Sequence, residues 1–549
     1  MSAEDLMRYL GVPLLFTLVV TLLITPILTL FYRNRLKILM AARGAGQGLE
    51  AARSSPAALA SSAPAPAQAL VALGGLGQRA GRAMAARCNA YAAAAGVQAL
   101  VLTALFARDY GSAMSWFGLL VVLLVFLLPT VWLLIQIRAV CGWFRLGGGC
   151  LALLGVLMVL GRLLGVDAVS LMLSVGVLHM LLPALLLLVL NLRFWRGAAP
   201  FVFLIALAGF FGWNFAFRIG GAWLGSTAGE PLLVVLRLIG LAAGSWLALL
   251  LLQKLGQVDG KAQLSDQELR LDLWMLIYTI VQALIFPLQA RRGDVDGAAV
   301  VALVLVLGSF GVYWLLKRYL LARFSPRIAL PARLLMLRVF GNNRRSESLF
   351  EQLRQAWNGF GSIELIAGTD LALQQITLPN FMAFLRGRLA DRFDCSGSEL
   401  VARLARPPQQ LADGSFHAHQ SPCHADRWLA VVNRLLGHCD AVVMDLREFN
   451  DQRQGCWAEL QALADGFGGR PVVLVVDGST DRKLLDTILA KLAVAVQPAS
   501  AAQWALVSAG RQDGGTVRSV LQTIEASVAA QPRGSQLAGG RLGSELRPA

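Results

Sequence analysis

Long apolar runs constrain this chain more than any other feature of its sequence. Hydrophobic residues make up 56% of the 549 residues, and the mean hydropathy is +0.60, which is well above globular usage. Several runs reach the roughly 20 residues that a helix needs to cross a bilayer. We therefore expect about nine transmembrane helices, at residues 9–32, 88–107, 115–137, 148–166, 168–191, 199–217, 231–253, 273–290 and 298–316.

The distribution of basic residues predicts how these helices are oriented. With the N-terminus outside, the inner loops hold 18 Lys and Arg residues and the outer segments hold five. Three of the inner residues fall in the loop 254–272 and three in 317–323. Because cytoplasmic loops carry the excess of positive charge, we expect the N-terminus outside and the C-terminus inside. The net charge of +16 then reflects membrane topology and anionic headgroups, and we expect no nucleic-acid partner.

The sequence divides into a membrane part and a C-terminal part. Residues 1–323 form the expected polytopic domain, whose first apolar run lacks the basic leader of a signal peptide and is predicted to be an uncleaved helix. Residues 41–86 are rich in Ala, Gly, Ser and Pro, which predicts a flexible cytoplasmic loop. From residue 331 to 531 the pattern is that of a soluble α/β domain, and the tail 532–549 is predicted to be disordered.

Short apolar runs alternate with amphipathic segments throughout residues 331–531. The expected strands are 334–340, 362–367, 441–446, 471–477 and 503–508, each followed by a helix. Five such units predict a five-stranded, parallel, doubly wound sheet of the flavodoxin or TIR type. Residues 395–438 interrupt the alternation before the third strand as an insertion, with a helix at 426–437.

Three aspartates lie at or just after the carboxyl ends of the predicted strands, where such sheets bind ligands: Asp370, Asp445 and Asp477. They are ligand-binding candidates. The alternative is structural, because an aspartate at a strand end also caps the turn or helix that follows. A response-regulator receiver is not expected, since no acidic cluster follows the first strand and no lysine follows the fifth.

Two stretches carry a resemblance to a known family. The segment from LRVFGNN to AGTDLA reads as strand, turn, helix and strand, and AVVMDLREFNDQRQGCWAEL reads as a third strand followed by a helix. Together they resemble the Toll/interleukin-1 receptor (TIR) domain family. Cys456, Glu459 and Leu460 match the C, E and L of that family's W-C-x-x-E-L pattern, whereas its tryptophan position is Gly455 here. The resemblance spans about 200 residues, mostly as topology.

The resemblance implies a role for Glu459. Some TIR domains cleave the nicotinamide–ribose bond of NAD, and the glutamate of this helix is their key carboxylate. A carboxylate there can stabilise the positive charge that develops on the ribose as nicotinamide leaves. On this interpretation Glu459 is catalytic, Cys456 is a nearby ligand-binding residue and NAD is the substrate. The alternative is that Glu459 only complements the dipole of its helix.

The other polar clusters are weaker candidates for a functional site. The segment HAHQSPCH at 417–424 lacks the paired spacing of zinc sites, so we expect a solvated loop and no metal site. Arg162, His179, Asn214 and Arg237 lie inside predicted spans without a carboxylate partner. That pattern is not typical of a transport pathway, although it leaves a transporter or channel open.

These observations predict an integral inner-membrane protein with a cytoplasmic TIR-like domain and a signalling, regulatory or interaction role. A membrane-anchored NAD glycohydrolase using Glu459, and a transporter or channel with a regulatory domain, are the alternatives. The lipid bilayer is the expected partner, and the TIR resemblance also allows a homo-oligomer through the cytoplasmic domain.

Overall fold

The computed structural model describes a large part of the chain. The described residues are 12–41, 76–110, 116–138, 159, 198–224, 230–262, 266–289, 296–325, 327–328, 331–338, 345–367, 376, 378–393, 398–411, 413–424, 427–467, 470–495, 503–510 and 513–529. The chain forms two compact units. One, the helical unit, contains residues 1–31, 84–325 and 374–382; the other, the α/β unit, contains residues 32–83, 326–373 and 383–549.

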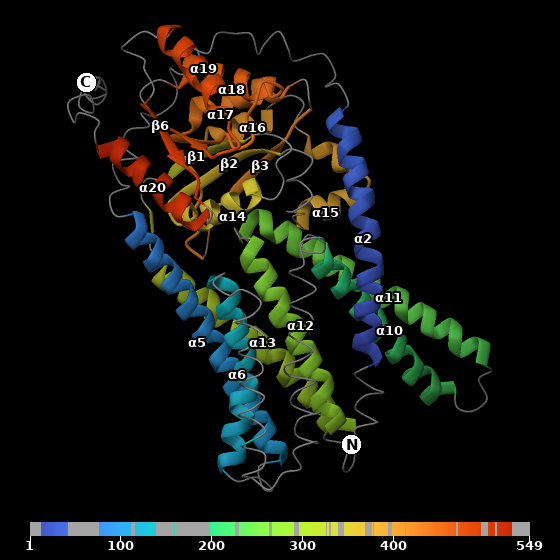
Figure 1. Ribbon diagram of the computed structural model, residues 1–549. Coiled ribbons are helices and arrows are strands. Elements are labelled where there is room, and N and C mark those ends of the chain that lie inside the picture. The colour runs from blue at the N-terminus through green and yellow to red at the C-terminus, as the bar shows by residue number, and fades with distance from the viewer. Residues whose placement is uncertain are drawn as a thin grey trace, which may run out of the picture. The chain divides into compact units, whose positions relative to one another are not determined.

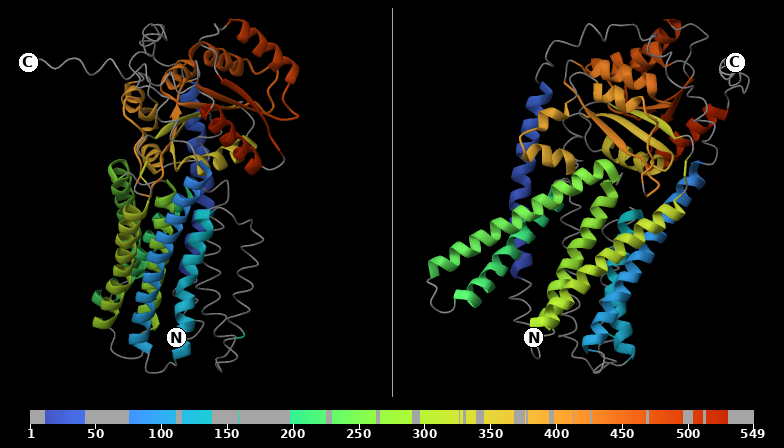
Figure 2. Two further views of the ribbon diagram at one scale, coloured as in Figure 1. Left: turned by 90° about the vertical axis from the view of Figure 1, so that its left-hand side faces the viewer. Right: turned by 180° about the vertical axis from the view of Figure 1, so that it is seen from behind.

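Long helices make up most of the described part of the helical unit (Figures 1 and 2). They are α2 (Val12–Ala41), α5 (Leu76–Tyr110), α6 (Trp116–Arg138), α10 (Ala199–Leu224), α11 (Glu230–Ala262), α12 (Asp266–Gln289) and α13 (Asp296–Phe324). Among the described residues, four segments are long and apolar enough to cross a membrane: Leu15–Ala41, Gly81–Arg108, Pro231–Lys254 and Val304–Phe324. The apolar stretches in α6, α10 and α12 are shorter. The expected spans 148–166 and 168–191 lie outside the described residues, apart from residue 159.

The helices α10 and α11 form a hairpin held together by glycines (Figure 1). A β-carbon added at Gly212 would lie 1.9 Å from the carbonyl oxygen of Gly240, and one added at Gly244 would lie 2.1 Å from the carbonyl oxygen of Ala208. No side chain fits at these distances, so the two backbones are in direct contact. Small residues at such spacing allow membrane helices to pack closely.

The α/β unit is built on one parallel sheet. Its strands are β1 (Ala332–Arg338), β2 (Gly361–Ala367), β3 (Ala418–Pro422), β4 (Ala441–Asp445), β5 (Pro471–Val476) and β6 (Gln503–Ser508). The helices are α14 (Arg345–Trp357), α16 (Ser398–Leu404), α17 (Trp428–His438), α18 (Gln454–Gly466), α19 (Arg482–Ala495) and α20 (Asp513–Ala529), with a 3₁₀ turn at Leu389–Arg392. A further helix, α15 (Leu378–Leu385), has its residues 378–382 in the helical unit. The parallel α/β architecture predicted from the sequence is confirmed.

The predicted number of strands was wrong. The described residues form a sheet of six strands in the order β3-β2-β1-β4-β5-β6. The additional strand, β3, lies inside the insertion and pairs with β2 at the edge of the sheet. Its sequence AHQSP is polar and contains a proline, a composition that edge strands tolerate and that gives no alternating apolar signal. The insertion helix predicted at 426–437 is present as α17.

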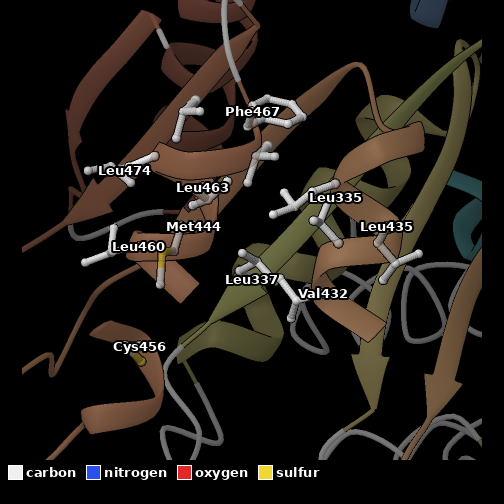
Figure 3. Close-up of a cluster of buried hydrophobic side chains, with 14 of the residues drawn as sticks. Leu335, Leu337, Val432, Leu435, Met444, Cys456, Leu460, Leu463, Phe467 and Leu474 are labelled. Atoms are coloured by element: carbon white, nitrogen blue, oxygen red, sulfur yellow. The ribbon is translucent and has the colours of Figure 1, made fainter. Parts of the chain in front are cut away.

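Apolar side chains cover both faces of this sheet. On one face α14 and α20 pack through residues such as Phe350, Trp357 and Val520. On the other face α17, α18 and α19 bury a second cluster that includes Leu485. Figure 3 shows Val432, Leu460 and Leu463 of this cluster. The central strands β4 and β5 are buried along their whole length, as expected of parallel strands covered on both sides.

Candidate functional site

The strand order places a topological switch at the centre of the sheet. The chain moves outward from β1 to β2 and β3, then returns to β4 on the other side of β1. At such a point the loops after the two central strands diverge, which makes their carboxyl ends the usual ligand-binding region. Arg338 ends β1 and Asp445 ends β4, and the two residues are register partners. Residues of opposite charge therefore end the two central strands, where the fold favours a ligand.

Asp445 is held by a neighbouring arginine. The Nε of Arg447 donates to Oδ1 of Asp445 at 2.8 Å, and Nη2 donates to Oδ2 at 2.8 Å. The exposed fractions of the two side chains are 3% and 0%. A two-bond pair of this kind is among the strongest ionic contacts in proteins. Both carboxylate oxygens of Asp445 are thus occupied, which favours the structural role over direct ligand binding.

Glu459 lies in the second turn of α18 and is 1% exposed. Burial raises the pKa of its carboxyl group to about 8, and the positive charge of Arg338 partly opposes that rise. Among the described residues, Oε2 of Glu459 has no hydrogen-bond partner. The carboxyl group of Glu459 is therefore protonated and uncharged at pH 7. It is buried in the protein interior, and its pKa responds to the charge of Arg338 at the switch point.

Cys456 lies one turn before Glu459 and is 3% exposed. Burial raises the pKa of its thiol to about 12, and at pH values where Glu459 and Asp445 are ionised their negative charges act in the same direction. A thiol with such a pKa is protonated at neutral pH and is a poor nucleophile. Cys456 packs in the core cluster shown in Figure 3, so its side chain contributes to packing.

Asp477 stabilises the turn after β5. Its Oδ1 accepts hydrogen bonds from the backbone nitrogen of Ser479 at 2.9 Å and from the Ser479 hydroxyl at 2.5 Å. The same hydroxyl oxygen accepts a bond from the nitrogen of Glu448, in the loop after β4, where Glu448 has φ 63°. The turn-capping alternative therefore describes Asp477 well. Asp370 lies outside the described residues.

The tryptophan that the TIR pattern requires is absent from α18, but an indole from another helix lies nearby. A β-carbon added at Gly455 would lie 3.8 Å from Cζ2 of Trp428, which belongs to α17. Trp457, in contrast, is 50% exposed. Trp428 therefore packs beside the position that the family tryptophan would occupy.

A second charged cluster, which the sequence did not reveal, joins β2, β3 and α16. Arg403 donates from Nη1 to both carboxylate oxygens of Glu364, at 2.8 and 2.6 Å, and from Nη2 to the hydroxyl of Ser421 at 3.2 Å. His419 is the register partner of Glu364. Its pKa is lowered well below the ordinary value by burial and then by the charge of Arg403. These bonds attach the insertion to the sheet.

The histidine-rich segment was expected to be a solvated loop, and part of it is strand β3 instead. Within the described residues, no group of three or more His, Cys, Asp or Glu side chains is arranged to hold a metal ion.

Comparison of the chain with protein-family models, with curated proteins and with solved structures finds no match.

Proposed function

We propose that the chain is a signalling or regulatory protein of the inner membrane, whose cytoplasmic TIR-like domain binds a nucleotide. Its helical unit spans the bilayer about nine times, with the N-terminus outside and the C-terminus inside. The balance of basic residues supports this orientation, and in the part of the chain that the structure describes four helices are long and apolar enough to span. The topological switch between β1 and β4 is the observation that carries the nucleotide-binding role.

The connection after β1 adds a second argument for an anionic ligand. By sequence it carries Asn342, Asn343, Arg344 and Arg345, and α14 begins at Arg345. The amino end of a helix offers free backbone N–H groups and the positive end of the helix dipole. Basic residues at this point favour phosphate groups, which nucleotides supply.

Charge reversal at this connection is expected to weaken nucleotide binding. NAD and ATP, titrated against the full chain in detergent, should raise its melting temperature. The double variant Arg344→Glu/Arg345→Glu should lose that shift because it repels phosphate. Arg518→Glu, an exposed position on α20, is the matched control and should keep the shift. If neither nucleotide stabilises the wild-type chain, the nucleotide-binding proposal is wrong.

Glu459 supports a second function, cleavage of NAD by a membrane-anchored glycohydrolase. Its burial next to the switch point is the specific observation in favour, because carboxyl groups with shifted pKa values gather at active sites. The ionised carboxylate is the form that stabilises positive charge on the ribose. Since the pKa of Glu459 is about 8, most of the enzyme would be in the inactive, protonated form at pH 7.

The pH profile tests this second function. Nicotinamide release by the full chain should increase with pH and level off above the pKa of about 8. Glu459→Gln should abolish release at every pH, while Asp465→Asn, on the exposed side of the same helix, should leave the rate unchanged. Equal release from the Glu459→Gln chain would show that this residue is not catalytic. If NAD binds but is not cleaved, the result supports the regulatory function and rules out the glycohydrolase.

A further inference from the structure

A buried layer of charged residues joins α12 and α13 in the helical unit. The Nζ of Lys317 donates to Oε1 of Glu268 at 2.7 Å and to Oδ2 of Asp272 at 2.5 Å. The hydroxyl of Tyr313 donates to Oδ1 of Asp272 at 3.1 Å. The exposed fraction of the Lys317 side chain is 0%. We call these four residues the ionic layer.

Other ionisable groups face this layer from α5 and α13. The ring of Tyr91, on α5, lies 5.4 Å from Nζ of Lys317. Arg87 lies one turn earlier on the same face of α5 and is 6% exposed, and Cys88 beside it is 2% exposed. Arg318 follows Lys317 on α13 and stacks over Trp314 at 4.7 Å. The buried region around the ionic layer therefore contains both positively and negatively charged side chains.

A neutral polar layer lies further along the same three helices. The Nε2 of Gln98, on α5, donates to Oγ1 of Thr279 at 2.8 Å and to Oγ of Ser309 at 3.3 Å. Both hydroxyls donate their own protons to backbone oxygens, of Met275 at 2.7 Å and of Val306 at 2.6 Å. Their oxygens can therefore only accept from Gln98, which fixes the orientation of its amide.

This orientation leaves the carbonyl oxygen of Gln98 without a partner. Gln98 is 1% exposed, and its Oε1 makes no hydrogen bond to the described residues. The hydroxyls of Tyr278 on α12 and Thr130 on α6 are also buried and have no partner among them. A buried polar atom without a partner is costly, so each of these atoms favours a small hydrogen-bonding ligand.

The unpartnered oxygen atoms of Gln98, Thr130 and Tyr278 lie at a similar depth in the helix bundle. Gln98 and Thr130 fall between two apolar clusters, one containing Tyr91 and Leu133 and the other containing Leu102 and Phe126. Tyr278 belongs to the second cluster. Three helices therefore supply unpartnered oxygen atoms to one depth of the bundle, a composition that suits water or a hydrated proton.

On each of the three helices, the residues that form or face the ionic layer lie on the same face as those of the neutral layer. Tyr91 and Gln98 are two turns apart on α5, and Asp272 and Thr279 are two turns apart on α12. On α13, which runs in the opposite direction, Tyr313 and Ser309 are one turn apart. Polar groups thus follow one another from the ionic layer into the middle of the bundle. Ionisable groups inside membrane helices commonly mark ion and proton pathways.

We propose that the ionic and neutral layers form a proton pathway through the helical unit, with Asp272 as the residue that accepts and releases the proton. A hydronium ion transfers a proton to a carboxylate oxygen of Asp272 and is left as water, and the new O–H bond weakens the bond of that oxygen to Lys317. The O–H bond of Asp272 then breaks, Asp272 returns to the carboxylate, and the proton passes through intervening water to a water molecule that donates a hydrogen bond to the Gln98 carbonyl and becomes hydronium. This function is independent of the nucleotide site and requires only the helical unit.

Proton flux tests the proposal directly. The full chain is reconstituted into liposomes that contain a pH-sensitive dye, and a pH gradient is imposed with the membrane potential clamped by potassium and valinomycin. The wild-type chain and Asp272→Glu should dissipate the gradient faster than protein-free liposomes. Asp272→Asn should fall to the protein-free rate, because an amide cannot accept the proton.

Two further variants separate a pathway from a structural ion pair. Gln98→Leu changes no charge and should also lose the flux, which a purely structural ionic layer would not require. Lys254→Met, at an exposed lysine on α11, should keep it. Helix content by circular dichroism and a single peak in gel filtration identify variants that fold. The proposal is overturned if the wild-type chain gives no flux above protein-free liposomes, or if folded Gln98→Leu conducts as well as wild type.

Discussion

Glutamine in place of Glu459 is expected to stabilise the α/β unit by roughly 3–5 kcal/mol at about pH 9, because each unit of pKa shift corresponds to about 1.4 kcal/mol. The folded-state pKa of Glu459 is about 8, against an ordinary value of 4.5. Between pH 4.5 and about pH 8, the folded protein therefore keeps a proton that the unfolded chain has already released. Stability must fall as pH rises from the ordinary value through the raised one, and then stay level.

Glutamine is uncharged at every pH and so removes this dependence. The two proteins should be nearly equal in stability near the ordinary pKa of 4.5 and diverge as the pH rises. Labelling of Cys439, a buried thiol in the same core cluster, reports opening of the unit when the full chain is titrated with urea. Asp465→Asn on the same helix is exposed and should follow wild type. A parallel pH dependence for Glu459→Gln would show that Glu459 is ionised in the folded protein.

The same substitution separates stability from activity. If Glu459 is catalytic, the Glu459→Gln chain is both more stable and inactive, which is the pattern expected when a site is maintained at a cost in stability. If the residue is only structural, stability increases and no activity is lost. The two measurements together therefore assign its role.

The sequence predicted the α/β unit well where strands are apolar and buried. Runs such as PVVLVV have one consistent environment, and β5 lies where that run predicted it. The polar strand β3 was missed because its stability depends on pairing with β2 and on Arg403, which is distant in sequence. The local sequence pattern of a strand does not reveal such long-range bonds.

Burial was the part of the candidate site that the sequence could not supply. The position of Glu459 near the carboxyl edge followed from the order of strands and helices. Its 1% exposure depends on how α18 packs against the sheet, and the Asp445–Arg447 pair depends on the conformation of one loop. These tertiary features decide whether a carboxylate is an acid, a ligand or a cap.

The ionic layer was missed for a related reason. Glu268, Asp272 and Lys317 were assigned to cytoplasmic loops, because charged residues usually end a membrane span. In the structure α12 begins at Asp266 and α13 continues to Phe324. The helices extend beyond the predicted spans 273–290 and 298–316, so these three charged residues lie within helices and pair with each other.

Gly240→Ala is expected to destabilise the α10–α11 hairpin, although alanine is the better helix former by roughly 0.5–1 kcal/mol. The added β-carbon would lie 2.2 Å from the carbonyl oxygen of Gly212 and 2.6 Å from Cβ of Ala216. The first of these atoms belongs to the backbone, so the helices must separate. Overpacking of this kind costs about 1–3 kcal/mol, or more where the backbone cannot move.

Gly311→Ala on α13 is the matched control, because a β-carbon there meets nothing within 4 Å. The two variants make the same chemical change in two membrane helices, so the expected effects differ in sign: Gly311→Ala leaves the chain unchanged or slightly more stable. Separation of the hairpin can be followed by cross-linking cysteines introduced at Ile205 and Ser245, whose backbone oxygen and hydroxyl are 3.5 Å apart. Cross-linking as efficient in Gly240→Ala as in Gly311→Ala would mean that the glycine contact does not hold α10 and α11 together, and that lipid or other helices do.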